Sequence, residues 1–420
     1  MNNKKTLLSL FVNVGSNVLS QVLAVAFIPI LARMYKPEDF AMATLFLGVA
    51  SCFVSISSLR LSVTIPLSAN EKDRGIGLVT STLIVLLLST AFFIFNEMFS
   101  LLEVLEIGSY SYILFLFVIL LSINNILINV IISNGSYKVI GGSKVLNSIT
   151  LNLTRLILAY TTLSNGMLYS LVVSEIFVFL LLYCYSKKTI KSYLSEYRFC
   201  LGECVEYIKK YIDYPKFQVI SQFILISSQY APIFMLSNSF STLQVGLFVM
   251  ANNLVSLPVN SVGLALSQIY LGEYRKKENQ KNIFKHSGYI VGFFMMASVP
   301  FIFLMSIWGD SIVGFLLGEQ WIDTAPLISM LIFLGSAKLC MAVISQSLNI
   351  FNGQRLQLFI NFLFFMLSYS SLYICIMLKW DFYTTVLLYT ISGSFALFVG
   401  IYLTMRNIMV KSKYENSIFG

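Results

Sequence analysis

Long apolar runs alternate with short polar breaks from one end of the chain to the other. Each run is long enough for a helix of about 20 residues, the length that crosses the hydrocarbon core of a bilayer. The breaks are rich in Gly, Asn, Pro and charged residues, which favour turns and loops. The pattern therefore predicts an all-α, polytopic membrane protein with about twelve transmembrane helices. The predicted spans are residues 8–32, 42–67, 76–97, 110–133, 145–164, 167–186, 216–237, 243–270, 287–308, 324–350, 358–378 and 382–405.

Basic residues fall mainly on one side of this alternation. With the N-terminus in the cytoplasm, 22 of the 28 Lys and Arg residues lie in cytoplasmic segments and three in outer ones. Cytoplasmic loops of membrane proteins collect Lys and Arg, so this bias predicts an even number of spans and both termini in the cytoplasm. The same rule accounts for the net charge of +9, and no nucleic acid is predicted as a partner.

Composition agrees with a protein dissolved in lipid. The chain is 57% hydrophobic and 11% charged, whereas a soluble domain carries roughly 25% charged residues. The six cysteines fit no disulfide framework. Cys200 and Cys204 lie one helical turn apart in a basic loop, but without a second Cys or His pair they do not indicate a metal site. We predict no metal and no cofactor.

The longest predicted loop, residues 187–215, separates the first six spans from the last six. We expect an N-terminal lobe at 1–186, a cytoplasmic amphipathic linker at 187–215 and a C-terminal lobe at 216–420. The linker places apolar residues among its lysines, a pattern typical of an interfacial helix: Tyr193, Leu194, Tyr197, Cys204, Val205 and Ile208. The two halves are faintly similar, as in many transporters built from repeats.

Three cations fall inside apolar spans: Arg60, Arg155 and Lys338. A cation near the bilayer centre costs roughly 2.5–3.5 kcal/mol on insertion scales, so such residues usually face a partner or a water-filled cavity. We expect these three to bind substrate in a cationic lumen. Arginine in particular matches the geometry of phosphate, which indicates an anionic cargo.

Uncharged polar residues also follow helical stripes within several spans. Their ordinary role in lipid is to hydrogen-bond one helix to another, and the alternative is that they line a cavity. The candidate lining residues are Asn17, Gln21, Asn125, Asn129, Gln222, Asn252, Asn260, Ser345 and Asn349.

Glu175, in the sixth predicted span, is the one clear acid within the spans. Intramembrane charges often pair, so Glu175 is a candidate partner for Arg155 in the neighbouring span. It is equally a candidate ion-coupling residue. In either case Arg60 and Lys338 have no evident intramembrane partner.

Three segments resemble polysaccharide flippases of the Wzx type. Residues 28–46 resemble that family's junction of spans one and two, residues 59–67 its arginine-bearing second span, and residues 245–270 its eighth span. Arg60 matches the family's second-span arginine. Leu61 and Ser62 stand where the family pattern often has an aromatic residue and a glutamate, which puts any local pairing through that glutamate in doubt.

The resemblance implies membership of a superfamily that also holds multidrug exporters and the lipid II flippase. It implies two six-helix lobes around a central cavity that opens alternately to each side of the bacterial inner membrane. The implied cargo is an undecaprenyl-diphosphate-linked oligosaccharide, moved from the cytoplasmic to the periplasmic leaflet for O-antigen or capsule synthesis. A polysaccharide polymerase and a chain-length regulator are the implied protein partners.

Two other functions compete with this interpretation. A drug or solute exporter of the same superfamily would use Glu97 and Glu175 for cation coupling. A membrane O-antigen polymerase or glycosyltransferase would need a catalytic outer loop. The outer loops at 98–109 and 309–323 contain acids but no His, and we find no nucleophile–base pair and no Gly-rich phosphate loop. We therefore predict that the protein is not an enzyme.

Overall fold

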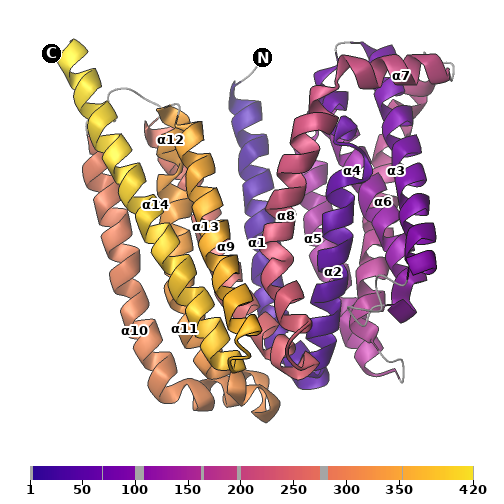
Figure 1. The fold of residues 1–420 in the computed structure, drawn as a ribbon. Helices are drawn as coiled ribbons and strands as arrows, with labels where there is room; N and C mark the ends of the chain where they lie inside the picture. Colours follow the sequence, from indigo (N-terminus) through magenta and orange to yellow (C-terminus); the bar gives the residue numbers. More distant parts are fainter. Residues whose placement is uncertain are drawn as a thin grey trace. The chain divides into compact units, whose positions relative to one another are not determined.

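The computed structural model describes residues 3–68, 70–99, 108–161, 165–195, 200–274, 282–351 and 353–419, with side chains between residues 15 and 411. Within these ranges the chain is helical, and each predicted span corresponds to one long helix (Figure 1). The long helices are α1 (Asn3–Met34), α2 (Pro37–Ser57), α3 (Glu71–Phe99), α4 (Ser111–Ser133), α5 (Tyr137–Ala159), α6 (Gly166–Ser195), α8 (Val219–Ser237), α9 (Thr242–Tyr274), α10 (Ile283–Leu317), α11 (Ala325–Ile344), α13 (Gln354–Met377) and α14 (Phe382–Phe419).

Short helical segments join or extend these long helices. They are η1 (Leu61–Leu67), η3 (Gly108–Tyr110), α7 (Leu201–Lys210), η4 (Tyr214–Gln218), η6 (Glu319–Thr324) and α12 (Gln346–Ile350). Among the described residues, 11 helical segments are long and apolar enough to cross a membrane. These segments confirm the predicted multi-pass membrane protein. Helix α5 is long enough but less apolar, because it contains Lys138, Lys144 and Arg155; it packs against α1 and α6.

Contacts divide the chain into two compact units. The first comprises Met1–Tyr35 and Asp39–Asn238, and the second comprises Lys36–Glu38 and Ser239–Gly420. Helix α8 groups with the first unit, whereas we expected residues 216–237 in the C-terminal lobe. Its side chains meet α2: a Cβ on Gly48 would lie 2.8 Å from the Tyr230 ring, and Cys52 Sγ lies 3.6 Å from Ser227 Oγ. The division into functional lobes stays a prediction.

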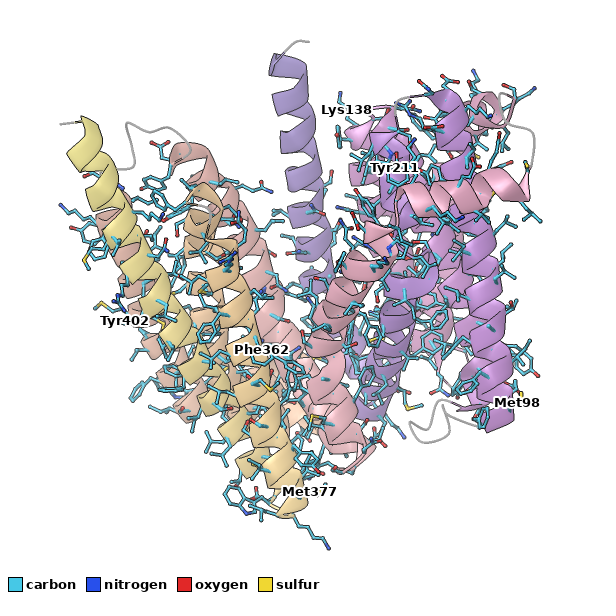
Figure 2. All side chains as sticks on the ribbon, turned by 45° about the horizontal axis from the view of Figure 1, so that its top comes forward. Met98, Lys138, Tyr211, Phe362, Met377 and Tyr402 are labelled. Atoms are coloured by element: carbon cyan, nitrogen blue, oxygen red, sulfur yellow. The ribbon has the colours of Figure 1, made fainter. Side chains whose placement is uncertain are left out.

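In the first unit, α2 to α6 run side by side, and α7 lies across one end of them (Figure 1). A cluster of buried side chains joins α4, α5 and α6: Leu127, Ile131, Ile140, Val178 and Leu182. Figure 2 shows Lys138 and Tyr211 toward the same end of this unit and Met98 at the opposite end. The predicted topology has Lys138 and Tyr211 in cytoplasmic loops and Met98 in an outer loop, and this placement agrees with it.

In the second unit, α11 packs against α9, α10 and α14, and α13 packs against α14. Gly246 on α9 lies directly against the backbone of Pro37. A Cβ at this position would lie 2.0 Å from the backbone oxygen of Pro37, a distance that no side chain permits. The missing side chain therefore allows α9 to lie directly on the backbone at the start of α2.

Three predicted elements differ from the structure in detail. The second span, 42–67, is broken after Ser57, and the tenth, 324–350, is broken at Ser345 between α11 and α12. In the linker, α6 continues to Ser195, so Tyr193 is a buried residue of that helix and not part of an interfacial one. The separate amphipathic helix is α7.

Candidate functional site

Arg60 lies at a break in the second span. Helix α2 ends at Ser57, and both Leu59 and Arg60 have positive φ, 47° and 58°. The left-handed conformation costs a residue with a Cβ roughly 1–2 kcal/mol, so this break must be held by its surroundings. Ser57, Arg60 and Thr64 stand at helical spacing in the sequence, but because of this break they do not lie on one helical face. Ser57 Oγ meets Ser122 Oγ at 2.8 Å, while Thr64 Oγ1 meets the hydroxyl of Tyr207 at 2.6 Å.

The guanidinium of Arg60 is half-buried, and part of it is unsatisfied. Its Nε is buried and has no hydrogen-bond partner among the described residues. A buried donor without a partner costs about 1–3 kcal/mol and is rare in proteins. A planar cation with a spare buried N–H is suited to a phosphate oxygen.

Lys338 is the corresponding cation of the second unit. It lies in the middle of α11, half-buried between the buried residues Ala337 and Leu339. Its Nζ is 5.6 Å from the centroid of the Phe364 ring on α13, a cation–π contact. Within the described part of the chain it has no carboxylate partner. The ammonium is therefore not neutralised by an acid there.

Ser345 and Asn349, two of the candidate lining residues, follow Lys338 in the tenth predicted span but lie beyond the end of its helix. Helix α11 ends at Ile344, so the helical spacing does not carry through Ser345. Ser345 Oγ donates to the carbonyl of Ala342 at 3.2 Å, and the exposed Asn349 donates to Gln346 Oε1 at 2.9 Å. Both side chains make local bonds next to the break.

The predicted span 145–164 places Arg155 at its centre, but in the structure Arg155 lies near the end of its helix. Because residues 137–144 join the helix, α5 begins eight residues earlier than the predicted span and ends at Ala159, one turn after Arg155. The Nε of Arg155 donates to Ser170 Oγ at 3.3 Å. Its carbonyl accepts a hydrogen bond from the hydroxyl of Tyr35, at the end of α1, at 2.7 Å. Arg155 thus joins three helix ends.

Glu175 pairs with two asparagines and not with Arg155. Asn124 on α4 donates from Nδ2 to Glu175 Oε2 at 2.7 Å and to the Glu175 carbonyl at 3.1 Å. Asn147 on α5 donates to Glu175 Oε1 at 2.6 Å. Glu175 is 8% exposed and Asn124 3%. Each carboxylate oxygen therefore accepts a hydrogen bond from an amide, and among the described residues neither oxygen pairs with a basic side chain.

Other predicted lining residues differ in exposure. Asn125 and Asn260 are exposed, while Asn17, Gln21, Asn129, Gln222 and Asn252 are half-buried. Asn129 Nδ2 bonds the carbonyl of Asn125 at 2.9 Å within α4. Whether these side chains line a cavity stays a prediction.

Sequence reasoning missed Asn124. We chose Asn125 and Asn129, but the buried face of α4 contains Leu127 and Ile131, and Asn124 lies three and seven residues before them. The apolar stripe of the helix therefore leads to Asn124 and identifies it as the buried amide. Lys144, expected in a loop, is also within α5 and half-buried.

The all-helical fold of this chain is similar to the folds of two solved membrane transporters. The inward-facing conformation of a multidrug resistance transporter of the MATE family, a member of the MOP superfamily, matches with a TM-score of 0.69 at 15% identity, over 94% of this chain and 96% of that one. The lipid II flippase MurJ, in its inward closed conformation, matches with a TM-score of 0.69 at 14% identity, over 97% of this chain and 91% of that one.

The chain belongs to the family described as polysaccharide biosynthesis protein, whose model matches residues 30–326. The expected resemblance to a polysaccharide family is thus confirmed. No curated protein sequence matches the chain. At these identities the two structures establish the fold, and the family establishes the biosynthetic context.

Proposed function

We propose that the protein is a flippase that moves an undecaprenyl-diphosphate-linked oligosaccharide from the cytoplasmic to the periplasmic leaflet by alternating access. The observation that carries the proposal is the buried, unpartnered Nε of Arg60 at the break in the second span. Membership of a polysaccharide biosynthesis family supports the saccharide part of the cargo. The transporter fold supports translocation and argues against a polymerase or other enzyme.

The diphosphate is the part of this cargo that cannot cross hydrocarbon unaided, because transfer of a charge from water into an apolar medium is very costly. Arg60 would replace part of its hydration through charge-assisted hydrogen bonds. Lys338, which has no acidic partner among the described residues, would add a second positive charge. Polar side chains such as Asn252 would bond the sugar hydroxyls, and the prenyl tail would stay in lipid.

Glu175 is our candidate for ion coupling. It is a buried carboxylate held by Asn124 and Asn147, and the Oδ1 of Asn124 is buried without a partner among the described residues. If the Asn124 amide turns over, Oδ1 accepts a hydrogen bond from protonated Glu175. The cluster can therefore hold the acid in either protonation state, as a coupling site must.

The proposed location is the bacterial inner membrane with both termini in the cytoplasm. The proposed pathway is the synthesis of a surface polysaccharide, O-antigen or capsule, and the proposed protein partners are its polymerase and chain-length regulator. Arg155 is a weaker candidate for cargo binding than Arg60, because its Nε bonds Ser170 near the end of α5.

A reconstituted assay tests the proposal directly. Proteoliposomes that contain the protein and a fluorescent undecaprenyl-diphosphate-linked sugar are treated with an impermeant quencher, which reports the fraction of cargo in the outer leaflet. We expect the wild-type protein to equilibrate the cargo between leaflets and R60A to fail. Equal rates in empty and protein-containing vesicles would contradict a flippase.

A drug or solute exporter is the second candidate, and the buried carboxylate of Glu175 favours it. Glu97, the other acid named for this role, accepts a hydrogen bond from Ser111 at 2.9 Å near the end of α3. Cells that lack the gene distinguish the two functions. A flippase deletion accumulates lipid-linked repeat units, whereas an exporter deletion increases sensitivity to cationic drugs without such accumulation.

A further inference from the structure

The amphipathic helix α7 is fixed to the broken second span by one buried tyrosine. Tyr207 is 3% exposed. Its hydroxyl lies 2.6 Å from Thr64 Oγ1 and 3.3 Å from Ser68 Oγ. Thr64 belongs to η1, and Ser68 directly follows it. A residue of the linker between the two halves of the chain therefore bonds the segment that begins one residue after Arg60.

The neighbouring helix α3 is shaped to admit this tyrosine. A Cβ on Gly77 would lie 2.5 Å from the Tyr207 hydroxyl and 2.9 Å from its Cζ. Any side chain larger than hydrogen would displace the ring. Ile76 packs against Tyr207 in a small buried cluster. The tyrosine thus occupies a fitted position between α3 and η1.

Two ion pairs set the register of α7 on α3. Lys72 Nζ lies 2.6 Å from Glu203 Oε1, and Lys210 Nζ lies 2.7 Å from Asp73 Oδ2. The pairs lie at opposite ends of α7, with the acid on α7 in one and on α3 in the other. Exposed pairs contribute little stability, but this opposed arrangement permits one orientation of the helix. Tyr207, between the two pairs, is thereby directed at η1.

The two residues directly before the segment held by Tyr207 are strained. Leu59 and Arg60 both have positive φ, and Arg60 is the residue directly before the first residue of η1. A second contact fixes the far end of the segment, since Arg74 Nε donates to the Ser68 carbonyl at 3.0 Å. Without these bonds η1 could relax toward ordinary backbone angles and carry Arg60 with it.

We propose that Tyr207 is a positioning residue: its hydroxyl holds η1 in place and so fixes the guanidinium of Arg60 where the cargo's anionic group binds. The link to cargo rests on the proposed function; the mechanical link from α7 to Arg60 does not. The linker helix therefore contributes to the binding site from outside the transmembrane bundle.

Thiol labelling tests the mechanical link. The six native cysteines are replaced in a chain whose level in the membrane is verified, and R60C is introduced. The rate of R60C modification by 2-(trimethylammonium)ethyl methanethiosulfonate is then measured with Tyr207, Y207F and Y211F. We expect Y207F to change the rate by about fivefold, the population shift that the loss of one hydrogen bond produces. Tyr211 is the matched control, because its hydroxyl has no hydrogen bond among the described residues, and Y211F should leave the rate unchanged.

Equal labelling rates in Y207F and Y211F would overturn the positioning role. Transport in the native chain provides a second measurement. If Tyr207 acts through Arg60, Y207F lowers the flipping rate several-fold alone but has less effect in an R60K background, because neighbouring residues in one network are not additive. Additive losses would also overturn the proposal. If the wild-type protein does not flip the cargo while Y207F still alters R60C labelling, the flippase assignment fails and the mechanical link from Tyr207 to Arg60 stands.

Discussion

Glu175 is a buried acid and Arg60 a half-buried base of the same unit, and their hydrogen bonding differs. Both carboxylate oxygens of Glu175 accept amide hydrogen bonds, from Asn124 and Asn147. The Nε of Arg60 is buried with no partner among the described residues, at a strained position. A buried charge whose hydrogen bonds are all made helps to hold its neighbours in place. A buried donor without a hydrogen-bond partner destabilises the fold, so its presence indicates a functional role. The difference predicts opposite responses to mutation.

The largest expected effect is on transport in R60A. Removal of a charge-assisted pair of roughly 3 kcal/mol lowers the flipping rate by about 100-fold. The thermal midpoint in detergent should stay the same or rise, because the variant also removes an unpaired buried donor. R60K should retain part of the activity, since it keeps the charge without the planar fork. A marked loss of stability in R60A would show that Arg60 is a structural residue.

Glu175→Ala should show the opposite pattern in stability. The substitution leaves the amides of Asn124 and Asn147 buried without their acceptor, at a cost of about 2–3 kcal/mol. We expect a lower thermal midpoint for E175A, measured in detergent by tryptophan fluorescence or calorimetry. E175Q is the matched control and should lose less, because it keeps one acceptor oxygen. If E175A and E175Q were as stable as the wild type, the buried cluster would have no structural role.

The two asparagines should be unequal. Asn124 donates to both the side chain and the carbonyl of Glu175, while Asn147 makes one bond to it. Asn124→Ala should therefore cost about 1–2 kcal/mol and Asn147→Ala about half as much, since each typical bond contributes about 1 kcal/mol. The same unfolding measurement ranks them, and the reverse order would contradict this account of the cluster.

The smallest expected effect concerns the exposed ion pairs of α7. Lys72→Ala should leave the thermal midpoint almost unchanged, because an exposed ion pair is screened by solvent and by salt. The hydrogen bond to Asp73 raises the pKa of Lys210. A raised pKa in the folded state stabilises the protein below the unfolded lysine value of about 10.4 and ceases to do so as pH rises beyond the folded value. Unfolding measured from pH 8 to 11 should show this loss in the wild type and not in K210M.

The long helices other than α5 were predictable because a long apolar run is what defines a membrane span. Breaks within spans were not predictable in this way. Residues 58–60 have no Pro or Gly to mark the end of α2, and the segment that follows them is bonded by Tyr207, which is more than 100 residues away in the sequence. The start of α5 was misplaced because Lys138 and Lys144 were interpreted as loop charges.

The candidate site was predictable in type but not in geometry. The rarity of charge in lipid singled out Arg60, Lys338 and Glu175. The partners of Glu175 depend on which faces of α4 and α5 turn toward α6, and one position separates the buried Asn124 from the exposed Asn125. Such choices are made by packing between helices, which a single sequence does not encode locally.

The modest hydropathy of α5 has a consequence for biogenesis. Helix α5 contains three basic residues. It is therefore not among the apolar spans found in the described part of the chain. The transfer of such a segment by itself from the translocon into lipid is only weakly favourable in free energy. The helices that pack on it stabilise it in the bilayer. We therefore expect α5 to insert together with α6 as a hairpin, so that nascent chains truncated before residue 166 leave it outside the bilayer.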